Sequence, residues 1–326
     1  MNKRYNKGIH DLKRVKEMQT DENISVIEKL NAYLENARII IKPSSAAVYQ
    51  RYMDSYIQPY FKDMLYSQLS SDKIQEFIVN LTKSGLSAVT VQAVYSFLKA
   101  GLKPSGKDSL FDVTLPKYSR QQVEYLSLDE QKRLEDAAKK EGNPMYLTMM
   151  IGLYTGIRLG ELCGLMWDDI DFSLKIMRIR RTLQRIAMRG EGDSKTQIII
   201  SEPKSPSSLR NIPLPGFLLS LLREYKQNAD SEYVLSAKGK HLEPRYIQNH
   251  FKRLLKAANV KDVNFHTVRH TFATRALENG FDVKSLSEIL GHASATVTLD
   301  KYAHVLDDHK RKLMEKMADN CFNIPE

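Results

Sequence analysis

Apolar residues recur every three or four positions over much of the chain, a spacing typical of helices that bury one face. Over 22–41 this spacing predicts a helix that ends before Pro43. Three more helices are predicted, each with a serine that can cap its first turn: 44–61, 70–85 and 87–101. The last two are expected to end at Gly85 and Gly101. The first part of the chain is therefore predicted to be a compact helical unit.

The helical period then stops, because Pro104, Gly106 and Pro116 interrupt a stretch with no sustained pattern. A new helix is expected directly after this stretch, where Ser127 and Glu130 have the spacing of a capping box. The predicted organisation has four parts: a basic tail (1–20), a helical domain (21–102), a linker (103–125) and a second domain with a C-terminal helix or tail (126–326).

Within the second domain the apolar period changes from that of a helix to that of a strand. Three isoleucine-rich segments alternate in this way: 175–186, 196–201 and 210–215. They predict one small antiparallel sheet, with 188–195 and 202–209 as its turns. Helices are expected to resume at Phe217 and to continue to the end of the chain. The predicted fold is mainly α with a small antiparallel β-sheet, in two domains.

The charge of the chain indicates a polyanionic partner. It has 49 Lys and Arg residues against 39 Asp and Glu residues, a net charge of +10 and a pI near 9.3. The excess is concentrated in 1–20 and 173–210.

There are two cysteines and no Cys-x-x-Cys pair, which argues against a disulfide framework or a zinc-thiolate site and fits a reducing cytoplasm. No apolar run approaches the roughly 20 residues that span a bilayer.

One predicted helix carries three residues whose spacing allows two different chemistries. His266 and His270, four residues apart, could bind a metal, whereas His266 and Arg269, three apart, could bind a phosphate. The sequence offers no acidic residues at a fixed spacing that could complete a metal site with these histidines. Arg269, which lies between them, would also repel a cation. The phosphate interpretation is therefore preferred, with His270 as a packed residue that orients the backbone or the helix of Tyr302.

Two other clusters belong to the same predicted domain. Arg158 and Glu161 project from one helix face, and taken alone they are explained by an internal salt bridge. His292 follows the helix-ending Gly291, and Tyr302 lies ten residues further on. An isolated tyrosine in an amphipathic helix is usually a packing residue. The order of all these residues along one domain is what carries information.

That order, Arg-x-x-Glu, a lysine in a basic β-turn, His-x-x-Arg, Gly-His and then Tyr, resembles the tyrosine recombinase (phage integrase) family, especially integrases of phages and conjugative transposons. The resemblance covers 127–326 and, more loosely, the helical unit before it. It implies site-specific cleavage and rejoining of DNA to integrate or excise a mobile element. It also implies a set of active-site residues: Arg158, Glu161, Lys204, His266, Arg269, His292 and the nucleophile Tyr302.

The residue types suit phosphoryl transfer. Arg158 and Arg269 would each donate paired hydrogen bonds to nonbridging oxygens, so no metal or other cofactor is expected. Tyr302, with a reference pKa of about 10, needs a base, for which we expect His266. A lysine would protonate the leaving 5′ oxygen; the resemblance places Lys204 there, with Lys195 as a competitor.

The remaining roles follow in the same way. His292 would donate to a phosphate oxygen, and Glu161 would hold Arg158 in place. The product would be a covalent 3′-phosphotyrosine, which conserves the energy of the broken bond, so that ATP is not needed.

By the same resemblance, the two domains would close as a clamp around double-stranded DNA at an attachment site. Basic residues of the linker would lie beside phosphates: Lys103, Lys107, Lys117 and Arg120. The C-terminal segment would dock on a neighbouring protomer in a homotetramer on DNA, through Leu306, Leu313, Met314 and Met317. An excision factor is a further candidate partner. The tail 1–20 stands where long integrases carry an arm-binding domain, which this chain either lacks or has lost by shortening.

Two alternatives remain at this point. One is a DNA-binding regulator with an inactive site, and the other is a type IB topoisomerase, which relaxes DNA without exchanging partners. The two-domain organisation favours recombination over the second, and an activity measurement is needed to exclude the first.

Overall fold

The computed structural model describes residues 23–102, 111–118, 123–187, 196–202 and 206–322. The chain divides into two compact units: residues 1–120 with 186–195, and residues 121–185 with 196–326. The predicted tail and two stretches of the predicted linker, 103–110 and 119–122, lie outside the described residues. The predicted domain boundaries therefore stay a prediction.

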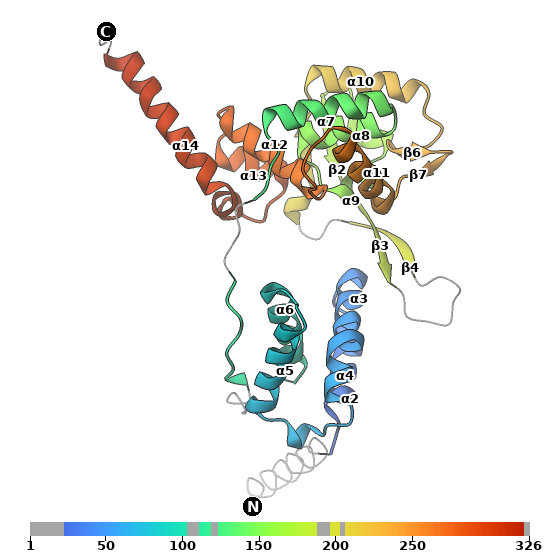
Figure 1. The fold of residues 1–326 in the computed structure, drawn as a ribbon. Helices are drawn as coiled ribbons and strands as arrows, with labels where there is room; N and C mark the ends of the chain where they lie inside the picture. The colour runs from blue at the N-terminus through green and yellow to red at the C-terminus, as the bar shows by residue number, and fades with distance from the viewer. Residues whose placement is uncertain (1–22, 103–110, 119–122, 188–195, 203–205, 323–326) are drawn as a thin grey trace, which may run out of the picture. The chain divides into compact units, whose positions relative to one another are not determined.

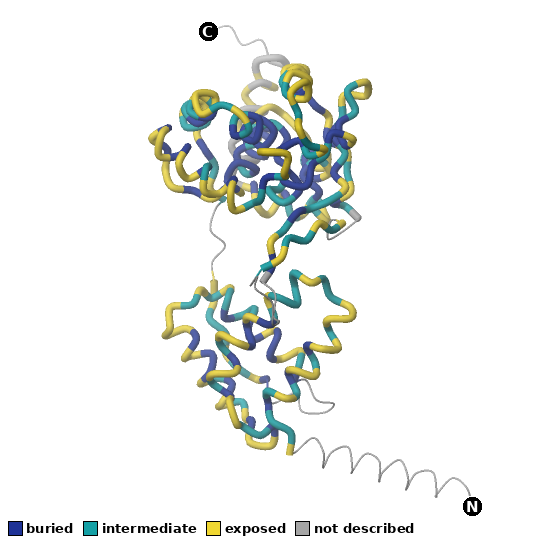
Figure 2. Tube along the Cα trace, turned by 90° about the vertical axis from the view of Figure 1, so that its right-hand side faces the viewer, coloured by how far each residue is buried: buried dark blue, intermediate teal, exposed yellow. Residues whose placement is uncertain are grey.

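The first unit is helical (Figure 1). Its elements are α2 (Val26–Arg38), α3 (Pro43–Tyr52), a π-helical turn (Met53–Ile57), α4 (Gln58–Phe61), a 3₁₀ turn (Tyr66–Gln68), α5 (Ser71–Lys83) and α6 (Ala88–Leu102). The apolar positions that predicted these helices form one core, in which Leu30, Ile57, Phe77 and Leu98 are buried. Figure 2 shows the buried positions alternating with exposed ones along each helix, as the spacing predicts.

The helix ends of this unit confirm some expectations and correct others. Ser70 caps α5 as predicted, accepting the Lys73 N–H at 3.3 Å. Helix α3 was predicted to begin at a capping serine. It begins instead at Pro43, which occupies its first turn. Gly101 does not end α6. A β-carbon there would lie 2.6 Å from Leu30 Cδ2, so the missing side chain allows α6 to pack closely on α2.

The second unit is a mainly helical domain around a larger apolar core. Its helices are α7 (Leu128–Glu141), α8 (Met145–Thr155), α9 (Leu159–Cys163), α10 (Gly216–Gln227), α11 (Pro244–Ala257), α12 (His266–Glu278), α13 (Val283–Leu290) and α14 (Ala295–Phe322). The predicted capping box is present at α7, where the Ser127 hydroxyl accepts the Glu130 N–H at 3.1 Å. None of the described helices has the length and apolar character needed to cross a bilayer.

The strands confirm a small β component but not the predicted single sheet. They are β1 (Ile170–Asp171), β2 (Ile176–Ile179), β3 (Thr182–Ala187), β4 (Thr196–Ser201), β5 (Arg210–Pro213), β6 (Ser236–Ala237) and β7 (Lys240–His241). The segment 175–186, predicted as one strand, is broken into β2 and β3. β5 pairs antiparallel with β2 in the order β1-β2-β5, whereas β4 pairs with β3, and β6-β7 form an unpredicted hairpin.

The strand pairing has a consequence for the site. Because β5 returns to β2, Arg210 lies opposite Ile179 at the end of the three-stranded sheet, next to α13. Helix α12 packs against α8, α13 and α14, so its first turn, with His266 and Arg269, lies where these elements meet.

Candidate active site

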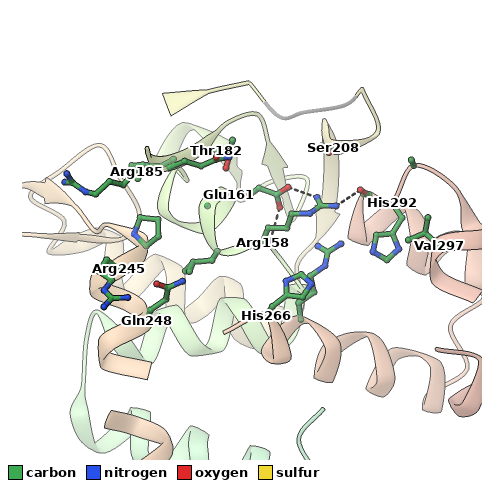
Figure 3. Close-up of a pocket in the computed structure, with 18 of the residues that line it drawn as sticks. Arg158, Glu161, Thr182, Arg185, Ser208, Arg245, Gln248, His266, His292 and Val297 are labelled. Atoms are coloured by element: carbon green, nitrogen blue, oxygen red, sulfur yellow. Dashed lines mark hydrogen bonds and ion pairs between the residues drawn. The ribbon is translucent and has the colours of Figure 1, made fainter. Parts of the chain in front are cut away.

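A groove of about 1050 Å³ runs along one side of the second unit. Its walls come from α9, β3, α11, the first turn of α12, the end of α13 and the first part of α14. Five residues predicted for the active site line it: Arg158, Glu161, His266, Arg269 and His292. Figure 3 shows the labelled members of this group, Arg158, Glu161, His266 and His292, gathered at one part of the groove.

The C-terminal end of α13 anchors three arginines. The carbonyl oxygen of Ile289 accepts a hydrogen bond from Arg210 Nε at 2.6 Å, that of Leu290 from Arg269 Nη2 at 2.6 Å, and that of Gly291 from Arg158 Nη2 at 2.7 Å. Carbonyls at a helix C-terminus lack partners within the helix and carry the negative end of its dipole, so guanidinium groups are well suited to them. The helix end therefore fixes all three side chains.

Two of the carbonyls that bind these arginines belong to glycines with left-handed backbone angles, one at the end of α13 and one at the end of α8. Gly291 has φ +65° and ends α13, and Gly156 has φ +62° and ends α8, where its carbonyl accepts a 2.8 Å hydrogen bond from Arg269 Nη1. A β-carbon at Gly156 would lie 2.4 Å from a ring carbon of Phe272. The guanidinium groups of Arg158 and Arg269 each make two hydrogen bonds within the protein, which leaves other N–H groups of the five on each to bind an anion in the groove.

Glu161 is the carboxylate that balances part of this charge, and it is buried with 4% of its surface exposed. Arg158 Nη1 donates to its Oε1 at 2.8 Å, and Arg210 donates to both oxygens, at 3.0 and 2.8 Å. Burial alone would raise the pKa of Glu161, but the bonds and charges of Arg210 and Arg158 lower it below the usual value. The predicted pair of Arg158 and Glu161 is confirmed as an ion pair.

Arg210, the second partner of Glu161, was not predicted from the sequence. Its guanidinium side chain is only 5% exposed and joins β5, α9 and α13. Arg210 is the first residue of β5, but its pairing with Glu161 spans 49 residues and cannot be derived from local spacing.

The histidines of the site are held in the neutral form. Burial, reinforced by Arg269 and Lys301, lowers the pKa of His266 to about 4 and that of His292 to about 3. His266 is exposed toward the groove, so burial contributes less there than at the half-buried His292, but the charges of Arg269 and Lys301 act in the same direction on both. His292 Nδ1 lies 2.8 Å from Thr298 Oγ1, which fixes its ring. At neutral pH each ring can therefore donate a hydrogen bond to a bound group or accept one from it.

These shifts predict that acid destabilises the protein. Between about pH 3 and 6.5 the unfolded state binds protons on His270 and His292 that the folded state does not bind, so the free energy of unfolding falls as pH falls. At pH 5 we expect a loss of about 1–2 kcal/mol for each of these two histidines relative to pH 7. Urea unfolding at both pH values measures it.

A variant that lacks one of the histidines with a lowered pKa provides the control for this prediction. His292→Asn should show a difference between pH 7 and pH 5 that is smaller by about 1–2 kcal/mol than that of the unchanged protein. Equal differences in the two proteins would contradict the assignment.

Tyr302 lies behind the wall of the groove. It is 1% exposed and belongs to a small apolar cluster with Ala273, Ala276, Leu277, Leu286 and Leu290. Its hydroxyl is 2.7 Å from His270 Nδ1, and burial raises its pKa to about 12. The helix α14 is interrupted at this residue, which has the non-helical angles φ −118° and ψ 20°. His270, which was expected to orient the backbone or the helix of Tyr302, contacts the Tyr302 ring and binds its hydroxyl.

The predicted basic residues are placed only in part. Lys204 and Lys195, the two candidates for the catalytic lysine, lie outside the described residues, as do Lys103, Lys107 and Arg120. Lys117 is described and exposed. Lys301, which was not predicted from the sequence, lines the groove beside Arg158 and Arg269; burial and these two cations lower its pKa. The roles of the two candidate catalytic lysines and of the four linker residues stay predictions.

The far part of the groove is also polar and basic. Arg245 and Gln248 project from the first turns of α11, and Arg185 on β3 makes a bidentate ion pair with Glu243 at 2.7 Å (Figure 3). In the part of the chain that the structure describes, no group of three or more His, Cys, Asp or Glu side chains is arranged to hold a metal ion. The wall is therefore suited to an extended anion.

Comparison with known proteins identifies the two units. Residues 124–309 match the model of the phage integrase family, and residues 28–81 match its N-terminal SAM-like domain. A tyrosine recombinase XerC-like protein of Caldanaerobacter subterraneus is 28% identical, over 91% of this chain and 84% of its own. A putative prophage phiRv2 integrase of Mycobacterium tuberculosis is 26% identical, over 86% of this chain and 76% of its own.

Solved structures share the fold. The Tn1549 transposon integrase, in complex with a circular intermediate DNA, superimposes with a TM-score of 0.76 at 22% identity, over 91% of this chain and 100% of that chain. A lambda integrase tetramer bound to a Holliday junction gives 0.65 at 18% identity, over 85% and 78%. The family match spans more than half of this chain and contains the arginines, histidines and tyrosine described above. The chain therefore belongs to the phage integrase family and is a tyrosine recombinase, an enzyme that cleaves and rejoins DNA strands.

Proposed function

We propose that this recombinase integrates or excises a mobile DNA element through a covalent 3′-phosphotyrosine on Tyr302. The observation that carries the proposal is the anchored pair Arg158 and Arg269, whose guanidinium groups face one groove next to the helix of Tyr302. Such a pair binds a phosphodiester and stabilises the charge that develops on its nonbridging oxygens. The reaction takes place on the cell's DNA, which in a bacterium means in the cytoplasm.

In the proposed cleavage step, the Tyr302 oxygen attacks the phosphorus and the bond to the 5′ oxygen breaks. His266 accepts the tyrosine proton when the hydroxyl reaches the groove; its low pKa keeps it neutral beforehand, and a bound phosphate anion raises that pKa. His292 donates a hydrogen bond to a phosphate oxygen. Lys204 gives a proton to the leaving oxygen, with Lys195 as the alternative. Glu161 and Arg210 hold Arg158.

Strand transfer tests this function directly. A preformed covalent adduct, given a strand with a free 5′ hydroxyl in EDTA and without ATP, should yield a joined product, because rejoining reverses the cleavage step. A matched strand with a 5′ phosphate should not be joined, since it lacks the attacking hydroxyl. A joined product that depends on ATP or a metal ion, or no joined product at all, would contradict the mechanism.

We further propose that four copies assemble on two DNA sites through the C-terminal segment. Met314 and Met317 lie three residues apart on α14 and are 61% and 49% exposed, so both can take part in a protein contact. The lambda integrase tetramer is a precedent for such an assembly. The linker residues Lys103, Lys107, Lys117 and Arg120 are proposed to contact phosphates, and an excision factor is a further proposed partner.

Removal of residues 307–326 tests the assembly. Binding to a single DNA site should change by less than about threefold, because the groove residues are retained, whereas cooperative binding to paired sites should be lost. Gel-shift titration on one-site and two-site duplexes measures both. Cooperative assembly by the truncated protein would remove the segment as the tetramer contact.

A further inference from the structure

The hydrogen bond between Tyr302 and His270 is not part of the proposed cleavage step. Attack requires the tyrosine oxygen to lie roughly 3–3.5 Å from the phosphorus, with the phosphate bound by the arginines. Tyr302 is 1% exposed, its ring is packed in an apolar cluster, and its hydroxyl binds His270 Nδ1 at 2.7 Å. A phosphate in the groove cannot touch a side chain that is covered to this degree, so Tyr302 must move before it reacts.

The surroundings of Tyr302 indicate how it is retained and where it can move. His270 lies one helical turn after His266 on α12, and their rings are perpendicular with centroids 4.6 Å apart. His270 therefore stands between the tyrosine and the groove histidine. On the other side, α14 is interrupted at Tyr302 itself, so a change of backbone angles at one residue can reorient the side chain without unfolding the helix before it.

We propose that His270 is a positioning residue that holds the Tyr302 hydroxyl behind the groove wall until DNA is bound. This inference rests on the proposed role of Tyr302 as the nucleophile. Both groups are neutral at pH 7, because burial lowers the pKa of His270 to about 3 and raises that of Tyr302 to about 12. A hydrogen bond between two neutral groups therefore joins the two atoms and holds the tyrosine hydroxyl away from the groove in the free enzyme.

Chemical modification of the DNA-free protein tests the proposal. Acetylation of tyrosines by N-acetylimidazole, followed residue by residue by peptide mass spectrometry, reports the accessibility of each hydroxyl. Tyr118 is 50% exposed and serves as the reactive reference. Tyr154, half-buried and bound to Glu135 at 3.1 Å, reports that the second unit stays folded. In the unchanged protein Tyr302 should react at least about tenfold more slowly than Tyr118.

Two variants separate the hydrogen bond from packing. His270→Phe keeps a ring of similar size but cannot bind the hydroxyl, and it should raise the acetylation rate of Tyr302 by about tenfold or more. His270→Asn keeps a polar atom close to the position of Nδ1 and should stay within about threefold of the unchanged protein. An unchanged rate in His270→Phe, or equally fast acetylation in both variants, would overturn the proposal.

A second measurement does not depend on the folding of a His270→Phe variant. Tyr302→Phe removes one oxygen, and the ring nitrogen resonances of His270 should shift relative to the unchanged protein, while those of His266 and His292 remain. Identical His270 resonances would show that the bond is absent in solution and would overturn the proposal. Neither measurement involves DNA, so failure of the nucleophile assignment would be detected separately, by cleavage that persists in Tyr302→Phe.

Discussion

Replacing Tyr302 by phenylalanine should abolish strand cleavage, with a loss of about 10⁴-fold or more, because the attacking oxygen is removed. DNA affinity should change by less than about threefold, since the residue is buried and does not line the groove. The free energy of unfolding should fall by only about 1 kcal/mol, the usual cost of one lost hydrogen bond. Adduct formation on a nicked duplex, a binding titration and urea unfolding measure the three quantities.

Tyr154→Phe is the matched control for this prediction. It also removes one hydroxyl with a hydrogen bond, to Glu135, from a half-buried tyrosine of the same unit. It should cleave DNA at the rate of the unchanged protein. Cleavage by Tyr302→Phe within tenfold of the unchanged enzyme would mean that another residue is the nucleophile.

Arg210→Leu should cause the second largest effect, although this residue is not expected to touch DNA. Its removal leaves Glu161 buried with Arg158 as its remaining ion-pair partner, and breaking a buried pair in this way costs about 3 kcal/mol of stability. Arg158 would then lose the fixed carboxylate that holds its guanidinium in place, so cleavage should fall by about 10²-fold. Urea unfolding and single-turnover cleavage measure the two losses.

Two further variants test whether Arg210 acts through Glu161. Adding Glu161→Leu to Arg210→Leu removes the unpaired charge, so it should restore part of the stability but not the cleavage rate. Arg178→Leu breaks the 2.6 Å pair with Asp171 in the same three-stranded sheet and should leave cleavage unchanged. Cleavage that recovers in the double variant, or falls equally in Arg178→Leu, would contradict a role in positioning Arg158.

The parts of the site that could be predicted from sequence depend on short-range order. Arg158 and Glu161 share one turn, and His266 and Arg269 share another, so their spacing alone places each pair on one face. The predicted ion pair and the capping box at Ser127 are both present. His292 and Tyr302 joined them only through the resemblance, because nothing local brings α13 and α14 to α12.

The parts that could not be predicted depend on contacts between distant segments. Alternation identifies strands but not their partners, so the return of β5 to β2 was missed, and with it the contact of Arg210 with Glu161. Gly101 was expected to end a helix because glycine often does, whereas it serves a close approach to Leu30. The bond between His270 and Tyr302 spans 32 residues and two helices.

Mapping the residue that becomes joined to DNA is the most direct test of the mechanism. The protein would be incubated in EDTA with a duplex carrying its attachment site and nicked close to the cleavage position, so that the short end diffuses away and the adduct accumulates. Nuclease and protease digestion followed by mass spectrometry should then find a nucleotide linked through its 3′ phosphate to Tyr302. A nucleotide on any other residue, a 5′ linkage, or an adduct that forms only with added metal would contradict the mechanism proposed here.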